Sequence, residues 1–329
     1  MRYPMKILSI YLLLAANVIM AGQALSTELP KPLVNTDWLA DNLEHVSIID
    51  VRSTGESFTS NPVFEKSNNS GVLKLIRVGG HIPGAHLVLY KHVRGNQIIN
   101  GTKVKYVLPG KSAFEKLMQN AGIHQQSNIV VVTNAENDFD LTMATRMYWQ
   151  IKYYGHENVS ILNGGTAQWL VDGRDIVTNS ENAIKGDWLA KMENTNLLAS
   201  SEEVIAAIDN DSIQIVDVRP LGQYLGTYKS AKVEEKGHIP SAKSYPVDLV
   251  ATRNTPVKFS SKSELTQLTK ALSVDLHEDT ITYCNSGHMA SGAWFVFHEI
   301  LGMNNIKLYD GSMHQWTAEK RPVVKMKLE

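Results

Sequence analysis

The residue with the most chemical information is Cys284, the single cysteine among 329 residues. It follows the run Thr-Ile-Thr-Tyr and precedes Asn-Ser-Gly-His and an apolar stretch. This pattern predicts a strand, a short loop made flexible by Gly287, and a helix. Ligands of α/β sheets bind at the carboxyl ends of strands, and a helix N-terminus stabilises a thiolate. The pattern therefore favours a nucleophilic cysteine over a structural one.

An anionic sulfur at this position needs hydrogen-bond donors. The candidates are the backbone N–H groups of the loop and the first helical turn, which belong to Asn285, Ser286, Gly287, His288, Met289 and Ala290. His288 could be protonated at mildly acidic pH. We predict no cofactor.

An internal repeat organises the elements that must position this loop. Residues 47–53 (SIIDVRS) return as 214–220 (QIVDVRP), residues 79–86 (GGHIPGAH) as 236–243 (KGHIPSAK), and residues 160–169 (SILNGGTAQW) as 307–316 (KLYDGSMHQW). The spacing between copies falls along the chain, which indicates insertions in the first copy, at 53–79 and 88–110. Repeats of solenoids span about 20 to 50 residues, so these longer copies are two whole domains.

Each copy alternates β-branched runs with helical periodicity. The predicted strands are 47–51, 128–132, 159–162, 213–217, 279–283 and 305–309, and the predicted helices include 112–122 and 263–272. Such alternation is typical of an α/β fold, so we expect two tandem domains, each with a mainly parallel sheet flanked by helices. The domains would span 33–176 and 199–325, with a polar linker at 177–198.

The N-terminus has the features of a secretory signal. Arg2 and Lys6 precede an apolar stretch, and small residues near Ala24 suit cleavage, so we expect residues 1–24 to be a signal peptide. We therefore expect an exported protein, in a bacterial periplasm, with no membrane anchor after cleavage. The 32 Lys and Arg residues balance 33 Asp and Glu residues, so nucleic acid is not an expected partner.

Asp-Val-Arg, Gly-His-Ile-Pro, a cysteine–loop–helix unit and Tyr-Asp-Gly-Ser with a later tryptophan occur in this order. The series resembles the rhodanese family of thiosulfate and 3-mercaptopyruvate sulfurtransferases, in tandem over residues 33–325. The resemblance implies that Cys284 takes the sulfane sulfur of a small donor, holds it as a persulfide and passes it to a thiophilic acceptor. Cyanide, a thiol or sulfite would serve as acceptor, and an acceptor protein is a further candidate partner.

The resemblance also implies a degenerate first domain, since Thr133 stands opposite Cys284. Arg219 matches the arginine of the family's Asp-x-Arg motif, so the resemblance makes it a candidate substrate-binding residue, and an ion pair with Asp217 or another carboxylate is an equally good interpretation. Two departures concern the donor. Gln223 replaces an arginine found in many active relatives, and the loop after Cys284 lacks the cationic pair of typical thiosulfate enzymes, so it is closer to the mercaptopyruvate type. Three lysines of a nearby segment could supply charge, although such lysines are usually solvated: Lys229, Lys232 and Lys236.

Other cysteine chemistries fit less well. A phosphatase loop needs an arginine six residues after the cysteine, where this chain has Ala290, and a protease needs a separate histidine base. A redox protein would need a resolving cysteine. His81 and His86 are not both repeated in the second copy, so no metal site is predicted. One alternative stays open, a non-catalytic sulfur carrier or binding module loaded by a partner protein.

Overall fold

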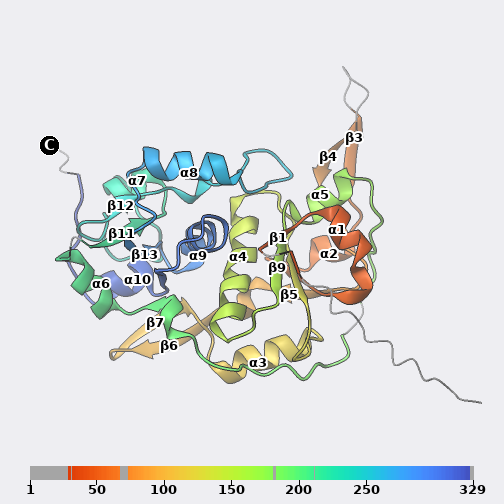
Figure 1. The fold of residues 1–329 in the computed structure, drawn as a ribbon, viewed down its shortest axis with the longest axis horizontal. Coiled ribbons are helices and arrows are strands. Elements are labelled where there is room, and N and C mark those ends of the chain that lie inside the picture. The colour runs from red at the N-terminus through yellow and green to blue at the C-terminus, as the bar shows by residue number, and fades with distance from the viewer. Residues whose placement is uncertain (1–28, 31, 67–72, 181–182, 211, 327–329) are drawn as a thin grey trace, which may run out of the picture.

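The computed structural model describes residues 29–30, 32–66, 73–180, 183–210 and 212–326, and it contains two five-stranded parallel sheets (Figure 1). The expected signal peptide, residues 1–24, lies outside the described residues. The first sheet has the order β1 (Leu33–Val34), β9 (Val159–Leu162), β8 (Ile129–Val132), β2 (Ser47–Arg52) and β5 (Ala85–Leu89). The second has the order β10 (Leu198–Ala199), β14 (Ile306–Tyr309), β13 (Asp279–Tyr283), β11 (Ile213–Asp217) and β12 (Lys243–Ser244). The two orders are equivalent, and the predicted tandem α/β fold is confirmed.

Helices flank both sheets. The first domain contains α1 (Thr36–Asp41), α2 (Glu56–Thr59), α3 (Lys111–Asn120), α4 (Asp138–Tyr153) and α5 (Gly165–Val171). The second contains α6 (Ser201–Ile208), α7 (Leu221–Leu225), α8 (Lys262–Ala271), α9 (His288–Phe295) and α10 (Ser312–Ala318). None of the helices in the described ranges is long and apolar enough to cross a membrane.

The sequence predicted the six inner strands to within one residue at each end. It missed the short edge strands β1, β10 and β12, because two residues leave no period to detect. It also missed β5, whose end falls inside a stretch that we interpreted as an insertion.

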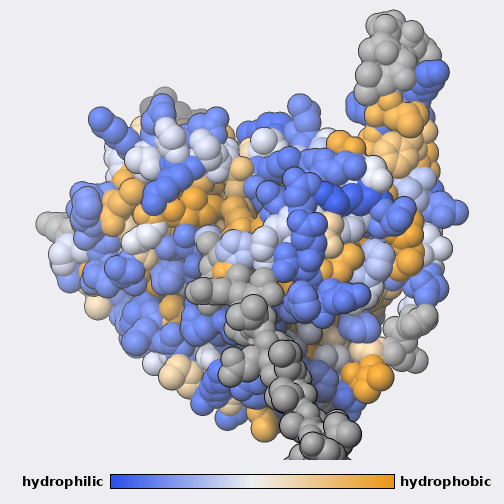
Figure 2. Space-filling view, turned by 45° about the vertical axis from the view of Figure 1, so that its right-hand side comes forward, coloured by the Kyte–Doolittle hydropathy of each residue, from blue (hydrophilic) through white to orange (hydrophobic). Residues whose placement is uncertain are grey.

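Both ranges expected to hold insertions in the first copy contain an antiparallel hairpin. One pairs β3 (Val63–Lys66) with β4 (Leu73–Arg77), and the other pairs β6 (Gly95–Ile99) with β7 (Thr102–Val107). The β3–β4 hairpin projects from the first domain and exposes apolar side chains, whereas β6–β7 reaches toward the second domain (Figures 1 and 2). The second hairpin therefore brings first-domain residues to the Cys284 side of the molecule.

Helices α4 and α9 form the centre of the domain interface (Figure 1). Gly292 lets them approach closely, since a Cβ atom there would lie 2.8 Å from Cγ2 of Thr142. The hydroxyls of Thr145 and Ser291 are hydrogen bonded at 2.9 Å across the same contact. One continuous hydrophobic core includes buried residues of both helices. The two domains are thus packed as one body around α4 and α9.

The segment between the sheets, residues 177–198, is anchored to the first domain at its centre. Gly186 and Trp188 donate backbone hydrogen bonds to the carbonyls of Gln119 and Ile123, at 2.8 and 3.1 Å. The indole of Trp188 is fully buried. Backbone hydrogen bonds and the packing of Trp188 therefore both hold the centre of this segment against the first domain.

We predict that Trp188→Ala lowers the free energy of unfolding by about 3–5 kcal/mol, because it leaves a large cavity under this segment. The matched control is Leu189→Ala, since Leu189 is 54% exposed and its truncation should change stability by less than about 0.5 kcal/mol. Urea unfolding of both variants measures the difference. Equal free energies of unfolding in the two variants would show that the packing of this segment does not stabilise the protein.

Candidate active site

Cys284 directly follows β13, and its side chain is 1% exposed. The loop turns through Gly287, which has a φ of +70° and forms the N-cap of α9. The backbone N–H of Ser286 donates to the Cys284 sulfur at 3.5 Å. The predicted strand, loop and helix are therefore present, and the loop amide of Ser286 contacts the sulfur as expected.

Ser312 fixes the shape of this loop from the start of α10. Its Oγ accepts hydrogen bonds from the backbone N–H groups of Cys284 and Gly287, both at 3.0 Å, and donates to the carbonyl of Tyr309 at 2.8 Å. Our sequence analysis missed this residue. A signal existed, because Ser312 replaces Gly165 of the first copy just as Cys284 replaces Thr133.

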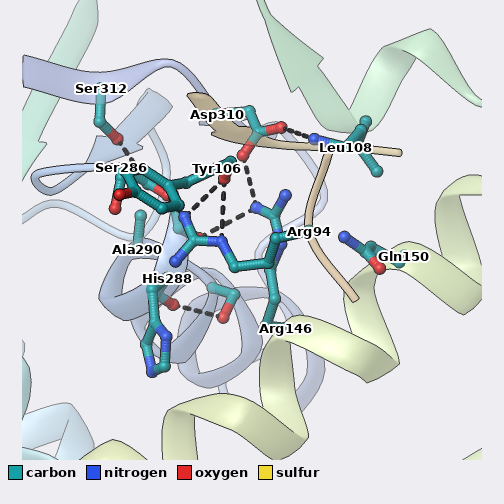
Figure 3. A network of polar contacts seen from close by, with 12 residues as sticks. Arg94, Tyr106, Leu108, Arg146, Gln150, Ser286, His288, Ala290, Asp310 and Ser312 are labelled. Atoms are coloured by element: carbon teal, nitrogen blue, oxygen red, sulfur yellow. Dashed lines mark hydrogen bonds and ion pairs between the residues drawn. The ribbon is translucent and has the colours of Figure 1, made fainter. Parts of the chain in front are cut away.

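The first domain holds the same loop through a buried ion pair (Figure 3). Arg146 of α4 donates from Nη1 to Asp310 Oδ1 at 2.5 Å and to the carbonyl of Gly287 at 3.1 Å. The other carboxylate oxygen of Asp310 accepts the backbone N–H of Leu108 at 2.6 Å. Burial opposes the charge of Arg146, but Asp310 outweighs it and raises the pKa of the guanidinium. Arg146 therefore joins Asp310 to the Cys284 loop, and Leu108 fixes the same carboxylate from the first domain.

A second arginine, Arg94, reaches the loop from just before β6 (Figure 3). Its Nη2 donates to the carbonyl of Ser286, and its Nε donates to the carbonyl of Tyr106 at 2.9 Å. The guanidinium also lies over the rings of Tyr90 and Tyr106, at 5.7 and 5.3 Å from their centroids. Our sequence analysis missed Arg94 because its contacts with the loop exist only after the domains dock.

Arg219 forms an ion pair, one of its two predicted interpretations. Its Nε and Nη2 donate to the carboxylate of Asp217 at 2.9 and 2.5 Å, and Nη2 also donates to the carbonyl of Gly237 at 2.7 Å. The first copy repeats this geometry with Arg52 and Asp50. A pair present in both copies shapes the fold, and direct substrate binding by Arg219 stays a prediction.

The prediction that His288 is charged at mildly acidic pH is wrong. Burial, then the charge of Arg94, hold the His288 pKa well below its ordinary value. Its Nε2 lies 2.6 Å from the hydroxyl of Thr142 and 3.2 Å from the carbonyl of Phe139. The carbonyl of Phe139 can only accept a hydrogen bond, and a proton on Nε2 satisfies this contact. His288 is therefore a neutral packing residue whose ring stacks on Phe139.

The remaining predicted residues have different surroundings. Asn285 donates from Nδ2 to Oε1 of Gln223 at 2.8 Å, so the residue in place of the family arginine ties α7 to the loop. Ala290 is fully buried, and Met289 is partly buried against the core. No hydrogen bond to the sulfur from the amides of Asn285, Gly287, His288, Met289 or Ala290 is present among the described residues.

A pocket of about 370 Å³ lies beside the loop, lined by Ser53, Tyr90, Lys91, Arg94, Gly95, Asn96, Tyr106, Phe139 and Lys232. Among the three lysines considered above, only Lys232 lines it. The hydroxyl of Tyr90 is buried without a hydrogen-bond partner among the described residues. Burial raises the pKa of Tyr90 to about 12, so its phenol stays neutral at physiological pH and can donate a hydrogen bond.

We predict that Gly287→Ala disables the thiol, because a Cβ atom there would lie 2.2 Å from Asp310 Oδ1 and 2.8 Å from Arg146 Nη1. Alkylation of Cys284 by iodoacetamide should slow at least about tenfold, which corresponds to about 1.4 kcal/mol. Gly302→Ala is the matched control, since its φ of +82° imposes a similar backbone cost but its Cβ would meet no atom within 4 Å. Equal alkylation rates in the two variants would contradict the prediction.

A second prediction concerns pH. The unfolded chain protonates His288 near pH 6.5, whereas the folded chain resists protonation. The contribution of His288 to the free energy of unfolding is therefore fully present above about pH 6.5, and it is lost as the pH falls further. His288→Gln does not titrate and can keep the hydrogen bond to Thr142. Between about pH 7.5 and about pH 5.5, its urea midpoint should fall less than that of the unaltered protein.

Two other buried histidines, His81 and His156, also have lowered pKa values through burial and titrate in both proteins. The difference between the two urea series therefore reports on His288 alone. Parallel curves would show that this ring does not contribute to the pH dependence.

The comparisons with known proteins agree with this architecture. The family described as rhodanese-like domain matches residues 35–172 and 200–319. A putative thiosulfate sulfurtransferase of Saccharopolyspora erythraea is 31% identical over 291 residues, with 87% of this chain and 92% of that protein covered. The sulfur carrier protein TtuD of Thermus thermophilus is 27% identical, with 87% and 94% covered.

Among solved structures, the 3-mercaptopyruvate sulfotransferase SseA of Escherichia coli matches with a TM-score of 0.69 and 24% identity, over 85% of this chain and 98% of that one. This likeness concerns the fold. The two segments matched by the family include every strand of the two parallel sheets except the edge strands β1 and β10, and they include the Cys284 loop. The chain therefore belongs to the rhodanese-like domain family, and it carries two such domains in tandem.

Proposed function

We propose that the protein is a sulfurtransferase in which Cys284 carries sulfane sulfur as a persulfide. The observation that carries the proposal is the position of the thiol, which follows a central parallel strand and receives the backbone N–H of Ser286. Arg146, Arg219 and Lys232 also interact electrostatically with Cys284. Positive charge and an amide donor are the surroundings that a persulfide needs. The sulfurtransferase names of the relatives support the same chemistry.

In the proposed first step, the Cys284 thiolate attacks the sulfane sulfur of the donor. A new S–S bond forms while the donor's S–S or C–S bond breaks, and the bonding electrons leave with sulfite from thiosulfate or with the enolate of pyruvate from 3-mercaptopyruvate. The enolate then takes a proton from solvent. In the second step an acceptor, such as cyanide, a thiol or sulfite, attacks the outer sulfur, and the Cys284 thiolate returns.

The first domain has a supporting role in this proposal. Thr133 occupies the place of Cys284 and is a poor sulfur acceptor. The loop after Thr133 is covered by the second domain, since the backbone N–H of Val257 donates to the carbonyl of Ala135 at 2.9 Å. The first domain would thus act through Arg94 and Arg146 rather than through a second nucleophile.

A sulfur carrier is the second candidate function. The small exposure of Cys284, 1%, favours it, because a persulfide shielded from water persists longer before transfer. The relative named as a sulfur carrier protein supports it too. Both candidates need a reactive Cys284, but only the enzyme needs rapid loading from a small donor.

The test is the intact mass of the reduced protein after brief exposure to thiosulfate or to 3-mercaptopyruvate. We expect a gain of one sulfur atom that cyanide reverses and that Cys284→Ser abolishes. The donor that loads faster identifies the donor class. Failure of both donors to load the protein would exclude the enzyme, and loading by a persulfidated partner protein would then identify a carrier.

A further inference from the structure

Strand β5 is the longest edge strand of the two parallel sheets. The other three edge strands in the described part of the chain, β1, β10 and β12, are two residues long, whereas β5 has five residues and pairs with β2 on one side. Its sequence, Ala-His-Leu-Val-Leu, contains no proline, lysine or carboxylate. Proteins usually keep edge strands short or place such residues on them, because an open edge pairs with further strands. β5 therefore lacks the usual protection against strand addition.

The open part of this edge is its carboxyl half. The segment 177–198 passes the start of the strand, since a Cβ atom on Gly122 would lie 3.1 Å from Ala183 Cβ and 3.5 Å from His86 Cδ2. Beyond His86, a groove of about 540 Å³ lies between β5 and α3 (Figure 1). Its apolar lining comes from both elements and from the residue after α3: Leu87, Val88, Leu89, Ala113, Leu117 and Ala121. An apolar groove beside a sheet edge suits an added strand.

The rim of the groove is basic. Lys116 and His92 line it, Lys91 precedes His92 in the chain, and no carboxylate is among the lining residues. Lys91 and Lys116 are exposed, and neither forms an ion pair with a carboxylate of the described residues. A second copy of this chain would bring the same lysines against one another in a symmetric pair, which is unfavourable. The charge of the groove therefore favours an acidic partner.

The carboxyl end of β5 leads to the Cys284 pocket. A single turn of 3₁₀ helix, Tyr90–His92, follows the strand. His92 lines the groove, whereas Tyr90 and Lys91 line the 370 Å³ pocket beside the Cys284 loop. The strand pairs of this sheet are all parallel. A segment added to β5 in the same direction therefore has its carboxyl end beside the Cys284 pocket.

We infer that an extended acidic segment of a partner protein adds to β5 as a sixth strand of the first sheet and carries a thiol at its carboxyl end to Cys284. Backbone hydrogen bonds supply the affinity, apolar side chains fill the groove, and acidic side chains meet Lys116. The role of the partner as sulfur acceptor rests on the proposed function. Its thiolate attacks the outer sulfur of the persulfide, a new S–S bond forms, and the Cys284 thiolate leaves with the electrons of the old S–S bond.

The first experiment measures docking without any sulfur transfer. The probe is a fluorescein-labelled hexapeptide of alternating glutamate and valine, and its binding to the full chain is followed by fluorescence anisotropy. A peptide with lysine in place of glutamate should bind at least about tenfold more weakly, because it meets like charge. A peptide with proline in place of valine keeps the acidic charge but cannot pair as a strand, and it should lose at least about tenfold as well. Failure of the glutamate–valine peptide to bind overturns the inference.

Variants at two exposed positions place the peptide in the groove. Ala113→Trp fills the groove and should weaken binding at least about tenfold, whereas Lys116→Glu reverses one charge and should weaken it at least about threefold at low ionic strength. The matched control is Lys262→Glu on α8 of the second domain, which is also exposed and changes the net charge equally, and its binding should equal that of the unaltered protein. Unchanged binding in both groove variants overturns the inference.

Analytical ultracentrifugation of the same proteins tests the competing occupant, a second copy of this chain. We expect the unaltered protein and Ala113→Trp to have the same mass in solution. A dimer of the unaltered protein that Ala113→Trp converts to a monomer would assign the groove to a second copy and overturn the inference.

The second experiment separates this inference from the proposed function. Protein loaded with sulfur is mixed with the glutamate–valine peptide extended by a cysteine at its carboxyl end, or with free cysteine at the same concentration, and the sulfur that each gains is measured by mass spectrometry. We expect the peptide to gain sulfur at least about tenfold faster, and the ratio of the two rates to fall to about one in Ala113→Trp, because docking raises the effective concentration of the thiol.

The outcomes distinguish the two proposals. If the unaltered protein does not load with sulfur but binds the peptide in the groove, the proposed function fails and the docking site stands. If the protein loads but the peptide gains sulfur no faster than free cysteine, delivery of an acceptor through β5 fails and the proposed function stands.

Discussion

The buried ion pair between Arg146 and Asp310 is the contact on which the arrangement of the site depends. Burying two charges costs free energy that only close geometry and further hydrogen bonds offset. Here the partners are 2.5 Å apart, and the backbone N–H of Leu108 satisfies the second oxygen of Asp310. Asp310 directly follows β14 and lies two residues before Ser312, which shapes the Cys284 loop. A contact between domains thereby fixes a loop within one of them.

Each domain makes an equivalent contact with the other, and the two contacts differ in charge. The backbone N–H of Phe259 donates to the side chain of Asn163 at 3.1 Å, just as Leu108 donates to Asp310. Asn163 and Asp310 occupy the same position of the repeat. The neutral amide in the first copy needs no buried cation, whereas the carboxylate in the second requires Arg146. The two copies therefore make the same docking contact, and only that of the second copy is charged.

Local features of the site could be predicted from the sequence, and features created by docking could not. The strand, loop and helix around Cys284 follow from β-branched residues, a glycine and an apolar run, which are neighbours in the chain. Arg94 lies 192 residues before Ser286, and no sequence period connects them. The charge of His288 was predicted wrongly for the same reason, because its burial depends on packing against Phe139 of the other domain.

The dependence of the Cys284 loop on Arg146 has a consequence for the order in which the chain is made. Synthesis proceeds from the N-terminus, and domains generally fold as units in that order. All first-domain residues that hold the loop, from Arg94 to Arg146, precede Cys284 by more than a hundred positions. The Cys284 thiol is therefore synthesised after these first-domain residues but before Asp310 and Ser312 of its own domain. A chain that ends between residues 284 and 310 would carry the thiol without Asp310 and Ser312, so the contacts that shape the Cys284 loop are complete only after synthesis has passed residue 312.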